Sequence, residues 1–556
     1  MNYNSSREPA FDEATVDKSS FIYTLVNRPL KCRLTSFENQ TECKQRKAAR
    51  MVELKGLPAM EEPATDYTLT INGQPVFTHQ ARVSAHPLNQ CWPGYQRPLE
   101  QTEIASFASW DMVAPVEVSI VSTRPVKDVR VRPRSYGINP KVDGNTIRFT
   151  VNKPGQLTVE VNGTHRVLHL FANPPENAIP DPNDPKVRYF GTGVHYPGVI
   201  RLESNQTIYL ADGAVVYGAI IAEKAKNVAI IGRGILDGSK FDRMDMYGAF
   251  SGLISLYDCE NVRIDGITLR DPSGWTIIPI ASRQVHIRNV KLIGLWRYNS
   301  DGIDFINCQH SSVEDSFIRS FDDSIVLKGY EKWPAFTYNS QILNTEFSAD
   351  GLSSHSVTEL QGYMGPYAIH AAPMHDIQVR RCVIWNDWGR ALEIGAETVA
   401  SEMNDLLFED CDIIHTTDIA MDVQNSDRAL CRNIVFRNIR VELDDDLTRR
   451  MNQTAKDQKY EVAPGDHYIP KLIVLEIVKN SVSYDAIRGH IEDIQFKDIE
   501  VTAHSMPYSN LRGFDAEHLV RRVSIENLCI NGQAVTSLEA GGFSANEFVR
   551  DVLIKV

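Results

Sequence analysis

Three aspartates with a regular spacing are the residues of this chain best suited to chemistry. Residues 299–305 read NSDGIDF, and residues 321–328 read FDDSIVLK, so that Asp323 falls on Asp301 at an offset of 22. Two short strands with matched alternation, one repeat apart, indicate consecutive coils of a parallel solenoid. Stacked strands lie about 4.8 Å apart, so we expect Asp301 and Asp323 to be near neighbours, with Asp322 pointing another way.

Crowded carboxyl groups of this kind suit the cleavage of a glycosidic bond. That reaction needs a protonated acid for the leaving oxygen and a carboxylate that activates water or attacks directly. Neighbouring charges raise the pKa of one carboxyl enough to keep it protonated near neutral pH. Five of the seven tryptophans fall between residues 275 and 388, and aromatic faces stack on sugar rings. A single aspartate at a strand end more often caps a turn, but three in register beside aromatic residues predict a carbohydrate cleft.

A repeated pattern over residues 188–556 predicts the scaffold that positions these acids. A polar residue followed by Val or Ile recurs along this region, at Asn227-Val228, Asn261-Val262, Gln284-Val285, Asp376-Ile377, Asn433-Ile434 and Asp493-Ile494. Repeats of 20–50 residues with β-branched runs and little helical periodicity indicate a parallel β-helix. The asparagines at matching positions are expected to form a stacked ladder, and residues 346–374 and 442–470 are read as loops.

A different pattern precedes the repeats. Residues 66–180 contain short alternating runs separated by Asn-Gly, Asp-Gly and Pro-Gly turns, which is typical of an antiparallel β-sandwich. The segment PDPNDP at 180–185 reads as a stiff linker, so we place a domain boundary near 176–188. Residues 1–65 form an N-terminal segment to which we assign no function.

Composition limits the classes of partner. The chain has 556 residues and a net charge of −13, which argues against nucleic acid, and it has no apolar stretch long enough to predict a membrane span. The N-terminus lacks the basic and apolar regions of a secretory signal, so we expect a cytoplasmic protein, or an extracellular one if a leader is missing. The cysteines in or beside strand-like runs are expected to be buried free thiols. The oligomeric state is left open.

The spacing of the acids also resembles a known family. Asn299-Ser300-Asp301-Gly302, followed by Asp322-Asp323, is similar to the NTDG and DD signatures of polygalacturonases, glycoside hydrolase family 28, over roughly residues 190–440. The resemblance implies a right-handed parallel β-helix that hydrolyses its substrate with inversion and needs no cofactor or metal. It also implies that Asp322 is the general acid, while Asp301 and Asp323 position and deprotonate the water.

The sequence departs from that family where a galacturonate would be held. Arg390 stands where the family's GHG motif has histidine, and Asp422 and Gln424 replace the cations of its RIK motif. An acid repels a uronate carboxylate, whereas Asp and Gln are ordinary partners of sugar hydroxyls. Glycoside hydrolase family 49, with its dextranases and isopullulanases, is also similar, since it combines a β-helix, three aspartates and an N-terminal β-sandwich. That resemblance implies a neutral α-glucan, while Arg390 and Lys328 remain candidate cations for a uronate.

The interpretation is therefore an all-β glycoside hydrolase, a right-handed parallel β-helix preceded by a β-sandwich, acting on a pectic or neutral α-glycan. Its predicted substrate-binding residues are Asn299, Lys328, Arg390, Glu393, Asp422, Gln424, Trp296 and Trp388. Arg390 and Glu393 have the alternative of a structural ion pair. The long loops favour exo or oligosaccharide action. The alternative functions are a β-helical polysaccharide lyase and a non-catalytic glycan-binding protein.

Overall fold

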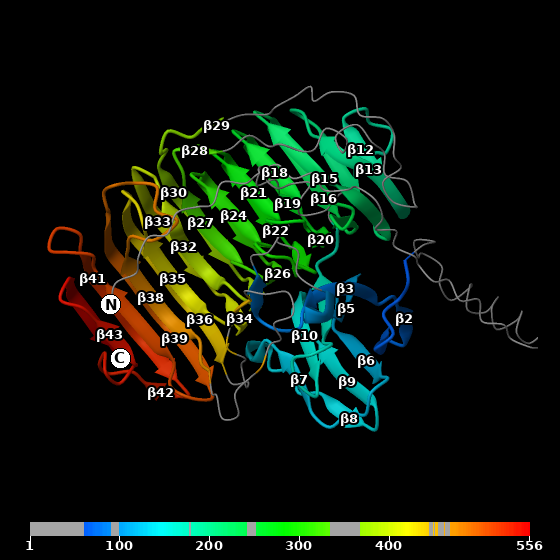
Figure 1. The fold of residues 1–556 in the computed structure, drawn as a ribbon. Helices are drawn as coiled ribbons and strands as arrows, with labels where there is room; N and C mark the ends of the chain where they lie inside the picture. Colours follow the sequence, from blue (N-terminus) through cyan, green and yellow to red (C-terminus); the bar gives the residue numbers. More distant parts are fainter. Residues whose placement is uncertain are drawn as a thin grey trace, which may run out of the picture. The chain divides into compact units, whose positions relative to one another are not determined.

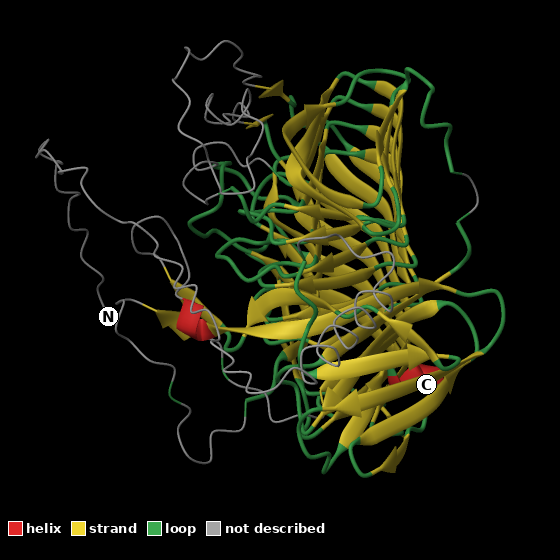
Figure 2. Cartoon of the chain, turned by 90° about the vertical axis from the view of Figure 1, so that its right-hand side faces the viewer, coloured by secondary structure: helices red, strands yellow, loops and turns green. Residues whose placement is uncertain are grey.

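The computed structural model describes residues 61–90, 99–176, 179–241, 252–333, 367–443, 449, 451–453, 461 and 468–556. The chain divides into two compact units, Met1–Lys55, which lies outside the described residues, and Gly56–Val556. The described residues are almost entirely strands and loops (Figure 2), and the short helices drawn in red there are 3-10 helices. Within them, no helix has the length and apolar character needed to cross a membrane. The loops expected at 346–374 and 442–470 fall mostly outside the described residues.

The N-terminal strands form two five-stranded sheets. In sheet order the first consists of β2 (Gln74–Val76), β1 (Tyr67–Ile71), β6 (Val116–Ser122), β9 (Thr146–Val151) and β8 (Lys141–Asp143). The second consists of β3 (His79–Ser84), β5 (Thr102–Asp111), β11 (Leu168–Asn173), β10 (Gly155–Val161) and β7 (Val129–Arg132). Apolar side chains of both sheets share one buried cluster, which includes Leu69, Val118 and Leu170. The pairing of β5 with β11 is parallel, which differs from the expected antiparallel arrangement because these strands are not joined by a hairpin.

The remaining strands form one 30-stranded sheet in which each strand pairs mainly in parallel with the third strand along, so that three strands make a coil (Figure 1). Its first half is β12 (Val187–Phe190), β13 (Gly193–Arg201), β14 (Thr207–Leu210), β15 (Ala214–Glu223), β16 (Lys226–Gly232), β17 (Ile235–Asp237), β18 (Ile254–Tyr257), β19 (Glu260–Asp265), β20 (Thr268–Arg270), β21 (Ile277–Ile280), β22 (Arg283–Arg288), β23 (Lys291–Ile293), β24 (Ile303–Ile306), β25 (Gln309–Glu314) and β26 (Phe317–Ser320). Its second half is β27 (Ile325–Gly329), β30 (Met374–Arg380), β31 (Val383–Asn386), β32 (Arg390–Thr398), β33 (Glu402–Glu409), β34 (Asp412–His415), β35 (Ile419–Asn425), β36 (Leu430–Leu443), β38 (Lys471–Ile477), β39 (His490–Ala503), β40 (Tyr508–Arg512), β41 (Val520–Ile530), β42 (Gln533–Ala534), β43 (Phe543–Ala545) and β44 (Val549–Lys555). The predicted parallel β-helix is confirmed.

Short elements complete the described chain. Two-stranded pairs join β28 (Lys332–Trp333) to β29 (Tyr367–Ala368) and β4 (Leu88–Gln90) to β37 (Met451–Gln453). The two 3-10 helices are η2 (Leu99–Gln101) and η3 (Arg134–Tyr136).

The predicted repeat corresponds to one ladder of the β-helix. Val228 pairs with Val262 and Val262 with Val285, and the later repeats at Ile377, Ile434 and Ile494 belong to the same ladder. The polar residue ahead of each has a positive φ, the left-handed region that Asn and Asp tolerate best. The expected asparagine ladder forms in part, since Asn261 Nδ2 donates to Asn227 Oδ1 at 2.8 Å. These turns fix the register of every coil.

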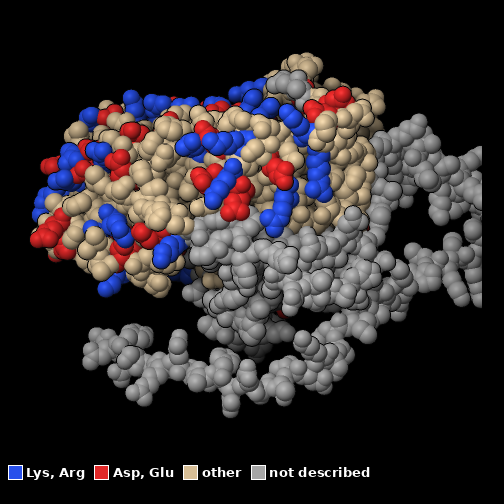
Figure 3. All heavy atoms as spheres, turned by 90° about the horizontal axis from the view of Figure 1, so that it is seen from above, with Lys and Arg blue, Asp and Glu red and all other residues tan. Residues whose placement is uncertain are grey.

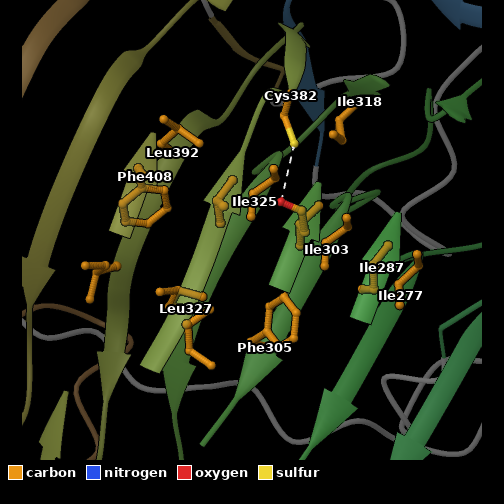
Figure 4. Close-up of a cluster of buried hydrophobic side chains, with 14 of the residues drawn as sticks. Ile277, Ile287, Ile303, Phe305, Ile318, Ile325, Leu327, Cys382, Leu392 and Phe408 are labelled. Carbon is orange, nitrogen blue, oxygen red and sulfur yellow. Dashed lines mark hydrogen bonds between the residues drawn. The ribbon is translucent and has the colours of Figure 1, made fainter. Parts of the chain in front are cut away.

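The interior of the β-helix is a stack of apolar side chains (Figure 4). Ile303 on β24 pairs with Ile325 on β27, then Leu392 on β32 and Met421 on β35, and all four are fully buried. The predicted offset of 22 is therefore the true register between β24 and β27. These four strands belong to adjacent coils and lie on the same face, where the candidate site is found.

Most of the cysteines at strand positions are buried, whereas charged residues at outward positions form ion pairs. Cys259, Cys308, Cys382, Cys411 and Cys431 are free and buried, as predicted, whereas Cys529, for which the same was expected, is free but only partly buried. Outward positions carry ion pairs between coils, such as Arg283–Glu260 at 2.8 Å and Arg440–Asp412 at 2.6 Å. On the face drawn in Figure 3, the coloured basic and acidic side chains are correspondingly interspersed.

Candidate active site

The three predicted aspartates lie just ahead of two paired strands. Asp301 precedes β24 and Asp323 precedes β27, each by two residues, so neither follows the inward alternation of the strand itself. The Gly302 N–H donates to the Asp323 carbonyl at 2.8 Å, and a Cβ on Gly302 would lie 2.2 Å from the Ser324 carbonyl oxygen. Glycine is required at that position because it lets the two coils approach. The expected proximity of Asp301 and Asp323 thus results from their placement at strand ends.

The peptide at 389–390 holds the Asp323 carboxylate. The Arg390 backbone N–H donates to Asp323 Oδ1 at 3.0 Å, and a Cβ on Gly389 would lie 2.5 Å from that same oxygen. Asn386 Nδ2 donates to the Asp322 carbonyl at 2.7 Å and so supports the turn that carries both acids. Exposure is 4% for Asp323 and 9% for Asp322, which makes Asp322 the more accessible of the two.

A buried lysine on β27 lies within ion-pair distance of three carboxyl groups. Lys328 Nζ lies 3.9 Å from Asp301, 3.7 Å from Asp323 and 3.4 Å from Glu397. The ammonium is also 4.7 Å from the centre of the Trp275 ring, a cation–π contact. Lys328 was predicted as a substrate-binding cation, and the structure places it between carboxylates.

Arg390, the other predicted cation, lies among four carboxyl groups. Its guanidinium is 3.6 Å from Asp323, 3.6 Å from Asp422, 3.7 Å from Asp418 and 3.9 Å from Glu393. The predicted ion pair with Glu393 is therefore one contact of four. A quarter of the Arg390 side chain remains exposed, so contact with substrate stays a prediction.

Three acids form a buried column beside the aspartates. Asp304 pairs with Val326, Val326 with Glu393, and Glu393 with Asp422, on successive coils. The three acids have no exposed surface, and neither oxygen of any of them receives a hydrogen bond from the N–H and O–H donors of the described chain. Burial raises the pKa of each, that of Asp422 to about 7. Glu393 and Asp422, both predicted to bind substrate, offer no accessible surface to a sugar in this structure.

The environment pushes the pKa values of Asp301 and Asp323 in opposite directions. Burial, followed by the charges of Asp304 and its neighbours, raises the pKa of Asp301 well above its usual value. Burial acts the same way on Asp323, but Arg390 and Lys328 outweigh it and lower the pKa of that carboxyl. Two adjacent carboxyls with separated pKa values can serve as a proton-bearing and an ionised group.

The two predicted tryptophans are mostly buried. Trp296 Nε1 donates to Asp271 at 2.9 Å, and the Arg297 guanidinium lies 4.9 Å from the centre of its ring. The Trp388 ring stacks on Phe321 at 6.0 Å. Exposure is only 6% for Trp296 and 5% for Trp388, so stacking on a sugar stays a prediction for both.

The remaining predicted binding residues lie at the edges of the site. Asn299 is partly exposed in the turn ahead of Asp301, with a φ of 53°. Gln424 Oε1 accepts a hydrogen bond from Asn480 at 3.1 Å. Gln424 therefore adjoins the loop 479–488, which follows β38.

That loop presents a residue that the sequence reasoning missed. Tyr484 is 65% exposed, and its ring meets that of buried Tyr330 edge-on at 5.4 Å. The buried carboxylate of Asp427 anchors the loop, because its Oδ1 accepts the N–H of Tyr484 at 2.6 Å and of Asp485 at 2.7 Å. An exposed aromatic ring on a held loop suits contact with a sugar face.

Comparison with known proteins gives a sequence match over part of the chain and a fold match over most of it. No family model matches the chain. A probable polygalacturonase of Vitis vinifera is 28% identical over 109 residues, which is 19% of this chain and 22% of that relative. The chain thus matches about a fifth of the length of this curated relative.

Among solved structures, Dex49A from Penicillium minioluteum superposes with a TM-score of 0.55 and 14% identity, covering 89% of this chain and 96% of that one. A hyperthermoactive exopolygalacturonase from Thermotoga maritima gives a TM-score of 0.42 and 17% identity, covering 66% and 84%. The first of these supports the fold. The resemblance predicted from the aspartate spacing, to polygalacturonases and to a family with an N-terminal sandwich, is confirmed as a resemblance.

Proposed function

We propose that this chain is a glycoside hydrolase that cleaves α-glycosidic bonds of a polysaccharide or oligosaccharide, with inversion, by means of Asp301, Asp322 and Asp323. The observation that carries the proposal is the placement of Asp301, Asp322 and Asp323 at the starts of two paired strands, with the pKa of Asp323 lowered by Arg390 and Lys328 and with Asp322 the most accessible of the three. Glycosidic hydrolysis requires the coexistence of a protonated and an ionised carboxyl. The partial match to a probable polygalacturonase supports the same class.

The roles follow from accessibility and charge. Asp322, the most exposed of the three at 9%, gives its proton to the leaving glycosidic oxygen. Asp323, held ionised by Arg390 and Lys328, accepts a proton from the attacking water. Asp301, which shares the Lys328 ammonium with Asp323 and whose pKa is raised by burial, orients the same water. In an inverting reaction the water attacks the face of the sugar opposite the acid.

We propose a neutral sugar as the substrate class. Around the two cations Lys328 and Arg390, the described residues place eight carboxyl groups, those of Asp301, Asp304, Asp322, Asp323, Glu393, Glu397, Asp418 and Asp422. A uronate carboxylate would approach cations that acids already neutralise, and like charges disfavour it. Hydroxyl groups of a neutral ring carry no such penalty.

The test is digestion of a glycan panel by the full chain. Dextran, pullulan, polygalacturonate and rhamnogalacturonan are incubated separately, and new reducing ends are counted. We expect the highest rate on a neutral glycan, and NMR of the fresh product should give the anomer opposite to the substrate linkage. Products with a carbon–carbon double bond would instead indicate a lyase, and retained configuration would reject inversion.

A variant of the general acid provides the matched control. Asp322→Asn removes the donated proton at nearly constant volume, and we expect the rate to fall about 10²–10⁴-fold with glycan binding retained. Binding is followed by calorimetry and folding by the melting temperature. Turnover by the variant at the unaltered rate would reject the role of Asp322, and absence of hydrolysis by the unaltered chain on every glycan would reject the proposed activity.

A further inference from the structure

The β-sandwich packs on two strands of the β-helix that lead into the candidate active site. Phe171 of the sandwich strand β11 shares one buried apolar cluster with Phe317 of β26 and Trp385 of β31, and the rings of Phe171 and Phe317 lie 5.2 Å apart. The strands β26 and β31 pair with each other on adjacent coils. β26 leads into the turn that carries the proposed acid and base, and β31 leads into the turn 387–389. The sandwich therefore lies against both strands that present the site.

A polar link crosses this apolar contact at His169 of β11, which is fully buried. Arg319 Nη1 on β26 donates to His169 Nε2 at 3.1 Å. Because a guanidinium only donates, Nε2 must accept, and the ring proton therefore lies on Nδ1. Thr158 Oγ1 lies 2.8 Å from Nδ1 and accepts that hydrogen bond. Burial, and then the charge of Arg319, lowers the pKa of His169 well below its usual value, so the ring stays a neutral acceptor.

Arg319 connects this histidine to the first residue of the turn 387–389. Its Nε donates to Asp387 Oδ2 at 3.3 Å, and its guanidinium lies 4.4 Å from the centre of the Trp385 ring. Trp385 Nε1 donates to the other oxygen of Asp387 at 2.8 Å. Exposure is only 2% for Arg319 and 7% for Asp387, so solvent screens this ion pair little. The position of the guanidinium therefore fixes the carboxyl group at the start of the turn.

The turn that starts at Asp387 in turn holds the proposed base. The Asp387 backbone N–H donates to the Ser320 carbonyl at 2.9 Å, which joins this turn to the end of β26. Three residues later the Arg390 N–H donates to Asp323 Oδ1 at 3.0 Å. Because a short stretch of backbone connects these two N–H groups, a displacement of Asp387 also displaces the donor of Asp323. The chain of contacts thus runs from the sandwich to the active site.

We propose that His169 of the β-sandwich is a positioning residue for the cleavage. His169 holds Arg319, and Arg319 holds the carboxyl group of Asp387. The turn that starts there presents the Arg390 N–H in the direction that orients the Asp323 carboxylate towards the water. This inference rests on the proposed function of the three aspartates. It gives the β-sandwich a part in catalysis without any contact with substrate.

The test compares two substitutions that differ in hydrogen bonding. His169→Phe keeps an aromatic ring in the apolar cluster but removes the acceptor of Arg319. We expect kcat to fall on the order of 10²-fold on the glycan that the unaltered chain cleaves fastest, with KM little changed because no substrate-binding group is altered. His169→Gln restores an acceptor, so it should keep kcat within about threefold of the unaltered chain.

A matched control separates this role from packing between the domains. Phe171→Leu removes a ring from the same strand and the same apolar cluster and leaves the groups of the polar link in place. We expect it to lower the melting temperature but to keep kcat within about twofold. Should His169→Phe fail to fold, Thr158→Val is the second variant, because it removes the hydroxyl that fixes the His169 ring with little change of shape.

Hydrogen–deuterium exchange tests the same link in the full chain without any substrate. The Arg390 amide should exchange about tenfold faster in His169→Phe or Thr158→Val than in the unaltered chain, because its hydrogen bond to Asp323 is weakened. Exchange in β41 should be unchanged, and His169→Gln should restore slow exchange at Arg390.

The outcomes that overturn the proposal are specific to the link. It is overturned if the folded His169→Phe variant keeps full kcat or unaltered exchange at Arg390, or if His169→Gln is as impaired as His169→Phe. It is also overturned if Phe171→Leu lowers kcat as much as His169→Phe, since packing alone would then explain the loss. Absence of any hydrolysis by the unaltered chain rejects the proposed function, and the exchange comparison still decides whether His169 positions the turn.

Discussion

Replacing Lys328 by methionine tests how much the ion pairs of this lysine with the acids of the site contribute to the free energy of unfolding. Its Nζ lies 3.4–3.9 Å from the carboxyls of Asp301, Asp323 and Glu397. One ionised partner at that distance attracts the ammonium by about 4 kcal/mol at an effective dielectric constant of about 20. The desolvation of the buried ammonium offsets part of this attraction. Breaking a buried ion pair by removing one partner costs about 3–5 kcal/mol, so we expect a loss of that size at pH 7.

The pH dependence of that loss has a defined sign. The pKa of Asp323 is lowered in the folded protein, so it contributes stability above its unfolded value, and that stability is lost as the pH falls through the folded pKa. Without Lys328 the pKa of Asp323 rises, and its contribution to stability shrinks to what Arg390 still supplies. The difference between the two proteins is therefore full above roughly pH 5 and shrinks below roughly pH 4.

Urea unfolding followed by circular dichroism, at pH 7 and below pH 4, measures this difference. Lys328→Arg keeps the charge and should recover most of the loss. Lys226→Met removes a lysine that is 60% exposed and 2.9 Å from Glu260, and it should cost far less because solvent screens that pair. A loss below about 1 kcal/mol at pH 7, or an equal loss at both pH values, would refute the reasoning.

Three further substitutions test other parts of the site. Gly389→Ala puts a Cβ 2.5 Å from Asp323 Oδ1, so we expect kcat/KM to fall about 10²-fold. As a control, Gly191→Ala should be neutral, because the nearest neighbour of its Cβ is 3.9 Å away. Full activity of Gly389→Ala would contradict the assigned position of Asp323. Asp427→Asn weakens the hydrogen bonds that hold the loop 479–488, and we expect the free energy of opening that loop to fall by about 1–3 kcal/mol. Limited proteolysis should then cut the loop faster. An unchanged rate of cleavage would mean that the Asp427 carboxylate is not needed to hold the loop. Asp422, with a pKa of about 7 in the folded protein, destabilises the fold as the pH rises from its unfolded pKa through 7. Asp422→Asn should abolish that loss, about 3 kcal/mol between pH 5 and 8 by urea unfolding, and identical pH dependence in both proteins would contradict the shift.

The register of the strands at the site could be predicted because it depends on short sequence patterns within each coil. The polar residue before each repeat occupies a left-handed turn, as at Asn227 and Asn261, and such turns recur once per coil. Matching the strands after 301 and 323 then gave the pairing of Ile303 with Ile325 and the proximity of the two aspartates. These features depend only on short-range pattern and on the regular stacking of a solenoid.

The partners of the cations could not be predicted in the same way. Arg390 was named from its alignment with a family pattern and Lys328 from its strand alternation with Asp322, and neither observation indicates which acids the neighbouring coils bring to them. Asp418 and Glu397 are single acids without a motif, and their positions depend on the packing of β32 against β35. Asp304 had a signal, since it is an acid between two apolar residues of a buried strand. Tyr484 had none, because its importance depends on the loop that presents it.

The hydrogen bond from the Arg390 backbone to Asp323 has a consequence for how the protein matures during synthesis. All three aspartates lie before residue 324, whereas the N–H that donates to Asp323 belongs to Arg390, the first residue of β32. A nascent chain that ends before that strand therefore contains all three aspartates of the proposed cleavage, but it lacks the N–H that orients Asp323. We therefore expect activity to appear during synthesis only after the coil that contains β32 has folded onto the preceding one.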